Sequence, residues 1–368
     1  FDHRFYHLTI HRAAEQRFMQ LNYETMEPTS HSLATRHATH TAEPDLVTSK
    51  PPGHRPGFLR LWRNLIIGTA LLNLGTATSF RTNAADAGLF AQTNLVAWCI
   101  VPFDGKKRGP EARAAMLEKL GIQRLAYDYR AEHIPTFDAE MEALARHDIE
   151  LTAWWFPGTL NDEARLILDV LKRHHLKTQL WLTGNGGPVT TPQEQETRLV
   201  AETDRIRPIA RAAAGIGCTV GLYNHGGWFG EPDNQIAILE RLRREGITNV
   251  GIIYNQHHGH EHLDHFEALL ARMKPYLLAL NLNGMSRGAD QQGDKILPIA
   301  QGDLDIALIR IIRKSGWTGP IGILNHTDED AELRLQDNLD GLQWILDQID
   351  GKPATPKPKP RSWQPPAE

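Results

Sequence analysis

Asparagine and histidine follow four separate apolar runs of this sequence. The runs end at Asn224–His225, Asn255–His258, Asn281–Asn283 and Asn325–His326. Imidazole exchanges protons near neutral pH, and a side-chain amide offers both a hydrogen-bond donor and an acceptor. An apolar run that ends in polar residues is typical of a buried parallel strand whose last side chains emerge at the edge of a sheet. We therefore expect these four segments to line one pocket.

Two of these histidines are candidates for acid–base catalysis. His225 and His258 end adjacent predicted strands, so we expect their side chains to face one another across a substrate. Glu132 and Lys295, which also follow predicted strands, are expected to assist them. The alternative for either histidine is a structural role in a hydrogen bond. The cluster His257–His262 does not match the zinc-binding pattern H-E-x-x-H, and a metal there is kept only as an alternative.

Aromatic residues accompany the amides and imidazoles at the predicted strand ends. The C–H face of a sugar ring stacks on a flat aromatic side chain, while its hydroxyls take hydrogen bonds from amides. For each tryptophan the alternative is packing within the fold. The expected substrate-binding residues are Asp128, Trp155, Trp181, Tyr223, Asn224, Trp228, Asn255, Asn281, Asn283, Asn325 and His326.

Strand-like and helix-like segments alternate from residue 95 to residue 349. The predicted strands are 95–102, 124–129, 150–156, 177–183, 219–224, 249–254, 276–282 and 320–324. The predicted helices are 110–120, 137–147, 162–175, 192–214, 234–245, 263–274, 304–314 and 332–349. Eight strands alternating with eight helices over about 250 residues predict an α/β fold, a single-domain (β/α)8 TIM barrel at 88–350. A doubly wound open sheet is the alternative, but no G-x-G-x-x-G follows the first predicted strand.

Several of these motifs resemble the xylose isomerase-like barrels, the sugar phosphate isomerase/epimerase superfamily. The matching pieces are Y-N-H-G-G-W, Y-N-Q-H-H-G-H, L-N-L-N-G-M and I-L-P-I-A-Q-G-D-L-D. The resemblance covers roughly residues 95–348. It implies a TIM barrel that acts on sugars and holds a divalent metal on carboxylates and histidine. At the metal-ligand positions, however, this chain has Tyr223, Asn255, Asn281 and Asn325, and amide oxygens alone bind a hard cation weakly.

The two ends of the chain are expected to lie outside the barrel. Residues 1–58 are polar and His-rich, which indicates a disordered leader or a mistranslated upstream region. Residues 59–87 have two arginines, Arg60 and Arg63, before an apolar core and an Ala-Asp-Ala site after it, which predict a signal peptide. The protein is therefore expected to be exported, to the bacterial periplasm or outside the cell, with no membrane segment in its mature form. The Pro- and Lys-rich residues 351–368 are expected to be a disordered tail.

Composition argues against a nucleic-acid-binding protein and against a disulfide-stabilised fold. The net charge is -4, so no general affinity for nucleic acid is expected. Two cysteines, Cys99 and Cys218, do not provide a disulfide framework and are read as small buried residues.

The sequence therefore predicts a sugar isomerase- or epimerase-like enzyme. It would act on a carbohydrate or keto-sugar by histidine-mediated proton transfer, without a cofactor or a metal ion, although a retained divalent metal is an alternative. Lyase chemistry is a variant of this prediction, and a non-catalytic carbohydrate-binding barrel is the alternative to it. The expected partner is a small carbohydrate. The sequence does not identify the sugar or the oligomeric state.

Overall fold

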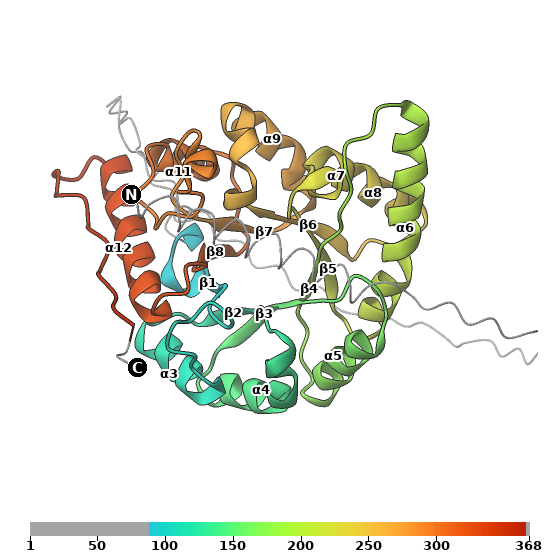
Figure 1. Ribbon diagram of the computed structural model, residues 1–368, viewed down its shortest axis with the longest axis horizontal. Helices are drawn as coiled ribbons and strands as arrows, with labels where there is room; N and C mark the ends of the chain where they lie inside the picture. The colour runs from blue at the N-terminus through green and yellow to red at the C-terminus, as the bar shows by residue number, and fades with distance from the viewer. Residues whose placement is uncertain (1–87, 366–368) are drawn as a thin grey trace, which may run out of the picture. The chain divides into compact units, whose positions relative to one another are not determined.

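Eight parallel strands close into a barrel in the computed structural model, which describes residues 88–365 (Figure 1). The strands pair in chain order, and β1 pairs with β8 to complete the ring. The predicted (β/α)8 TIM barrel is therefore confirmed. The strands are β1 Leu95–Trp98, β2 Arg124–Tyr127, β3 Glu150–Trp155, β4 Gln179–Leu182, β5 Thr219–Tyr223, β6 Val250–Asn255, β7 Leu277–Leu282 and β8 Ile321–Leu324.

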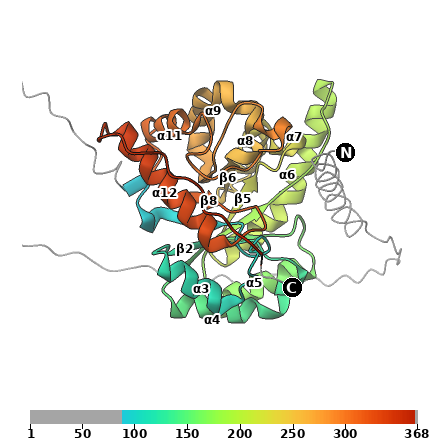
Figure 2. The same ribbon diagram turned by 60° about the vertical axis from the view of Figure 1, so that its left-hand side comes forward.

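Helices connect successive strands and cover the outside of the ring (Figures 1 and 2). The α-helices are α3 Pro110–Lys119, α4 Phe137–Arg146, α5 Asp162–Arg173, α6 Pro192–Gly215, α7 Gly227–Gly230, α8 Pro232–Arg244, α9 Phe266–Met273, α10 Ala289–Gln292, α11 Asp305–Lys314 and α12 Ala331–Ile349. The 3-10 helices are η1 Gln92–Asn94, η2 Ala131–Thr136, η3 Gln256–His258, η4 His260–His265 and η5 Lys274–Tyr276. No helix of residues 88–365 is long and apolar enough to cross a membrane.

The helix boundaries follow from local signals in the sequence. Helix α6 begins with a capping box, in which the Thr191 hydroxyl accepts from the backbone N–H of Glu194 and the Glu194 side chain binds back. At the other end of a helix, the chain must turn sharply into the next strand. Gly121 makes this turn after α3 with a φ of 68°, a left-handed conformation that glycine adopts without steric cost.

The barrel has two apolar layers. The outer layer lies between the strands and the helices and contains most of the buried aliphatic residues. The inner layer fills the ring and includes Val96, Trp98, Ala153, Trp181 and Tyr223. Because side chains alternate along a strand, Trp154 belongs to the outer layer and its neighbour Trp155 contacts the inner one.

Strand register brings the polar ends of the strands to the same level. Asn255 of β6 lies opposite Asn281 of β7, and Asn281 lies opposite Gly322 of β8. Gly322 has no side chain, and a Cβ atom there would collide with the amide oxygen of Asn281. The register and this glycine therefore let the Asn281 amide enter the barrel.

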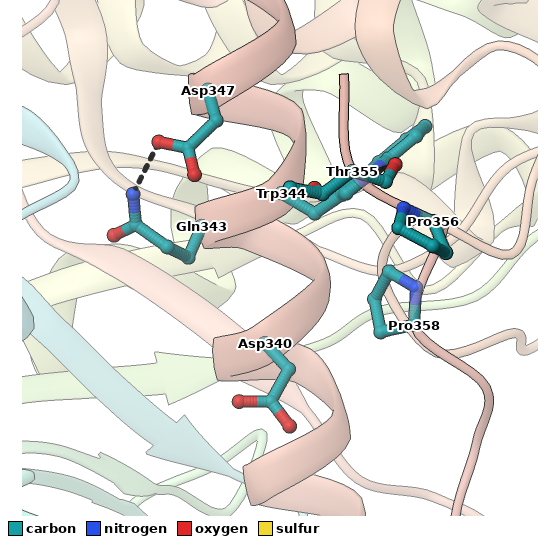
Figure 3. Close-up of a pocket in the computed structure, with 7 residues that line it drawn as sticks. All are labelled: Asp340, Gln343, Trp344, Asp347, Thr355, Pro356 and Pro358. Carbon is teal, nitrogen blue, oxygen red and sulfur yellow. Dashed lines mark hydrogen bonds between the residues drawn. The ribbon is translucent and has the colours of Figure 1, made fainter. Parts of the chain in front are cut away.

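The segment after α12 runs back along that helix (Figure 2). The indole N–H of Trp344 donates to the carbonyl of Thr355 at 3.0 Å, and a groove lies between helix and segment (Figure 3). Further along, Arg361 binds Asp337 at 2.7 Å, and the Trp363 ring lies against Gly105. Residues 352–365 have no regular secondary structure, and their predicted disorder stays a prediction.

The predictions for the amino-terminal part of the chain concern residues that the structure does not describe. The leader at 1–58 and the signal peptide at 59–87 both lie outside residues 88–365. Export to the periplasm stays a proposal for the same reason.

Candidate functional site

Four histidines gather at the carboxyl ends of the strands. His225 follows β5, His257 and His258 form the end of η3 after β6, and His326 follows β8. The ring centroids of His225 and His258 are 4.5 Å apart, those of His257 and His258 3.7 Å, and those of His257 and His326 5.8 Å. The four imidazoles therefore form a continuous group. We call this group and the polar and aromatic residues around it the rim cluster.

Aromatic side chains lie beneath and beside the imidazoles. Trp98 is at the centre: its ring centroid is 4.8 Å from that of Trp181, 5.9 Å from that of Trp155 and 5.8 Å from that of Tyr223. Trp155 in turn lies 6.4 Å from His225, centroid to centroid. Trp98, Trp181 and Tyr223 are almost completely buried, whereas Trp155 is partly exposed. Trp155 is thus the ring of this layer that a ligand could reach.

Two of the predicted asparagines have structural hydrogen bonds. The Asn224 amide accepts from the backbone N–H of Asn255 at 2.7 Å and donates to its carbonyl at 3.1 Å, which ties β5 to β6. The Asn325 amide donates to the carbonyls of Cys99 and Phe103, at 3.3 and 3.2 Å. Asn325 therefore joins the end of β8 to the loop after β1. Its amide oxygen has no hydrogen-bond partner among the described residues.

Buried polar atoms without a partner are concentrated at the same strand ends. Within the described residues they include both amide atoms of Asn281, the amide oxygens of Asn283 and Asn325, one carboxyl oxygen of Asp128, and the Nδ1 atoms of His257 and His326. A buried polar group without a hydrogen bond costs about 1–3 kcal/mol. Such a concentration is expected where a ligand or water supplies the missing bonds.

Two cationic side chains border the imidazoles. The guanidinium of Arg130, after β2, lies 5.3 Å from the ring centroid of Phe103, and this ring lies 3.7 Å from that of His326. Lys295 lies on the loop after β7, where its carbonyl accepts from His260 Nε2 at 3.1 Å.

The surroundings keep the imidazoles neutral. Burial lowers the pKa of His326 to about 3 and that of His257 and His258 well below the ordinary value of 6.5, and the charge of Lys295 lowers all three further. Burial and the charges of Lys295 and Arg130 also lower the pKa of His225, although the residue as a whole is exposed to solvent. Burial raises the pKa of Asp128 to about 7.

Two residues predicted for the site lie elsewhere. Trp228 packs in the outer layer, where its indole N–H donates to Gln195 of α6 at 2.6 Å. Glu132 lies on η2 with a side chain that is 70% exposed, and its carboxyl oxygen is 4.0 Å from His133 Nδ1. No contact in the described part of the chain joins either of them to the rim cluster, so their roles stay predictions.

The site residues expected from the sequence did not include His257, Phe103, Arg130 and Trp98, although all four stand at strand ends or within a few residues of them. In η3 successive side chains point about 120° apart, as in any 3-10 helix. The sequence therefore did not distinguish His257 from His258 by alternation. Phe103 joins the cluster through its contact with His326, which is distant in sequence.

Comparisons with known proteins agree with this architecture. The family model for the xylose isomerase-like TIM barrel matches residues 161–347, about half of the chain. Among solved structures, the IOLI protein with a binding zinc atom has 13% identity and a TM-score of 0.54, covering 69% of this chain and 98% of its own. A xylose isomerase domain protein from Alicyclobacillus acidocaldarius has 16% identity and a TM-score of 0.52, covering 70% and 99%.

A third solved structure is the probable 3-DHS dehydratase AsbF from Bacillus anthracis. It has 14% identity and a TM-score of 0.52, and the match covers 67% of this chain and 98% of that one. At these identities the three structures share the fold and show nothing further. No curated protein matches the sequence significantly.

The positions that the resemblance assigns to metal ligands do not fit a divalent cation. The Tyr223 hydroxyl is bonded by Asn255 Nδ2 and by Trp98 Nε1, and burial raises its pKa well above the ordinary value, so it stays a neutral phenol. Asn281 and Asn325 offer only neutral amide oxygens. Residues 88–365 contain no group of three His, Cys, Asp or Glu side chains arranged to hold a metal ion. A neutral oxygen set of this kind binds a hard cation weakly.

Proposed function

The chain belongs to the xylose isomerase-like TIM barrel family, and we propose that it is a sugar isomerase- or epimerase-type enzyme that moves a proton with histidine and without a metal ion. The observation that carries the proposal is the contact between His225 and His258, whose ring centroids are 4.5 Å apart at the ends of neighbouring strands. Two imidazoles in contact at this distance can reach adjacent atoms of one small substrate.

Neutral imidazoles suit the first step of such a reaction. His225, whose pKa is lowered and whose ring is exposed to solvent, would accept the proton from a carbon next to a carbonyl group. A carbon acid of this kind is already activated when the substrate is a keto-sugar. The N–H of a neutral His258 would donate to the oxygen that becomes negative, because a neutral imidazole is a hydrogen-bond donor as well as an acceptor.

Substrate binding would divide between the aromatic and the polar parts of the rim cluster. Trp155, the accessible ring, would stack on the C–H face of the sugar. The unpartnered amide atoms of Asn281 and the amide oxygen of Asn325 would bind hydroxyls. In this arrangement the sugar supplies the hydrogen bonds that these buried groups lack.

The test is solvent exchange with candidate keto-sugars. The wild-type protein in D2O is expected to exchange the proton next to the carbonyl, as followed by NMR. His225→Ala and His258→Ala should each lower the rate by about 100-fold or more, which is the scale of general acid–base catalysis. His147→Ala, a surface histidine paired with Glu111, is the matched control.

Two outcomes would contradict the proposal. Unchanged exchange in both His225→Ala and His258→Ala would exclude their role as acid and base. Tight sugar binding by the wild-type protein with no exchange for any substrate would favour a carbohydrate-binding barrel without catalysis.

A further inference from the structure

Lys295 lies on the loop after β7, next to the residues that follow β6 and β7. It contributes to the lowered pKa of His225, His257, His258 and His326 alike. Its backbone is fixed at this place, because its carbonyl accepts from His260 Nε2 at 3.1 Å and from Asn283 Nδ2 at 3.5 Å. The residue is half-buried.

This charge has no partner among the residues that the structure describes. Among residues 88–365, no carboxylate forms an ion pair with the Lys295 ammonium group. The electrostatic effects on His225 and His326 come from cations and imidazoles, with no carboxylate among them. Asp128, the buried carboxyl group of the cluster, has a pKa of about 7 and is therefore only partly ionised at neutral pH.

The rest of the cluster is prepared for a polar ligand. The Asn281 amide, 0% exposed, has no partner for either atom within the described chain. The Asn325 and Asn283 amide oxygens are also buried without a partner. A half-buried positive charge beside these groups loses part of its solvation. A ligand with a negative charge would compensate for this loss by forming an ion pair with it.

We propose that the rim cluster binds a sugar that carries a carboxylate group, with Lys295 as its counter-charge. This inference rests on the proposed function, because it names the substrate class of the same site. One lysine matches one negative charge. The other cation, Arg130, directs its Nη1 to the carbonyls of Asp128 and Tyr129, so a doubly charged phosphate is the poorer match.

The test is isothermal titration of the full-length protein with matched sugars. The probes are D-glucose, D-galactose and D-mannose, the corresponding uronates, and the corresponding 6-phosphates. At least one uronate is expected to bind about 10-fold or more tightly than its neutral parent, which is the scale of a charge-assisted hydrogen bond. The preference should weaken as the salt concentration rises, whereas binding of the neutral sugar should not change.

A pair of lysine variants assigns the effect to one residue. Lys295→Met is expected to remove the preference, so that the uronate and its neutral parent bind with equal affinity. Lys314→Met is the matched control, because Lys314 is exposed in the last turn of α11. It removes the same charge and should leave the preference unchanged.

The possible failures can be told apart. Equal affinity for a uronate and its parent, tighter binding of a 6-phosphate, or an unchanged preference in Lys295→Met would each overturn this inference while leaving a sugar-binding site in place. Absence of binding by every sugar of the panel would overturn this inference, whereas absence of proton exchange with every keto-sugar in the NMR assay would contradict the proposed function itself.

Discussion

Replacement of His326 by glutamine is expected to make the protein more resistant to acid. His326 is half-buried, and its pKa is about 3 in the folded state, compared with 6.5 ordinarily. Between these values the unfolded chain binds a proton at this residue and the folded chain does not. The group therefore contributes full stability above pH 6.5, and this contribution is lost as the pH falls from 6.5 towards 3.

The magnitude follows from proton linkage. Between pH 6 and 5 the unfolded imidazole is about 90% protonated, so one histidine changes the free energy of unfolding by about 1.2 kcal/mol per pH unit. The wild-type protein should lose this amount on acidification, and His326→Gln should not. Asp128→Asn should have the opposite effect, because a carboxyl group with a raised pKa takes up a proton on folding in this range.

The assay is urea unfolding at several pH values from 5 to 7 for the three proteins. The quantity to compare is the slope of the free energy of unfolding against pH, since every other titrating group is common to all of them. Equal slopes for the wild-type protein and His326→Gln would refute the reasoning, because they would mean that the imidazole is protonated equally in the folded and unfolded states.

Three further predictions concern metal and stability. Metal analysis of the purified protein should give less than one equivalent of divalent metal per chain, and EDTA should leave the melting temperature unchanged. One tightly bound metal ion per chain would contradict the conclusion that the neutral oxygen atoms of this site bind a divalent cation weakly. Glu140→Leu should destabilise the protein by about 3–5 kcal/mol in urea unfolding, because it leaves the buried Arg113 charge unpaired, and adding Arg113→Met should recover much of this loss. Arg361→Ala should cost about 1–3 kcal/mol in the same assay, because Asp337, only 3% exposed, loses a partner. Arg165→Ala, at an exposed position of α5, should cost little.

Several features of the fold were accessible from the sequence because they depend on neighbours along the chain. Alternating apolar runs and capped helices identified all eight strands and the eight long helices, with boundaries within a few residues. The residues that end the strands were also predictable, since in a parallel barrel every strand ends on the same face. This reasoning placed His225 and His258 at the ends of adjacent strands and expected them to face one another across a substrate, whereas in the structure the two rings are in direct contact.

Other features of the site depend on which layer a side chain enters and on ring closure. An apolar pattern shows that a residue is buried, but a barrel strand is buried on both sides. The sequence thus did not separate Trp181, inside the barrel, from Trp228, which packs against α6.

Closure of the ring joins residues from the two ends of the barrel sequence. The backbone N–H of Asn325 donates to the carbonyl of Trp98 at 2.9 Å, and this pairing brings His326 against Phe103. Local pattern carries no information about a contact between residues more than 200 positions apart. The sequence by itself therefore determined which strand ends supply polar groups to the rim, and the tertiary structure decided which side chains enter it, which of them meet and which remain without partners.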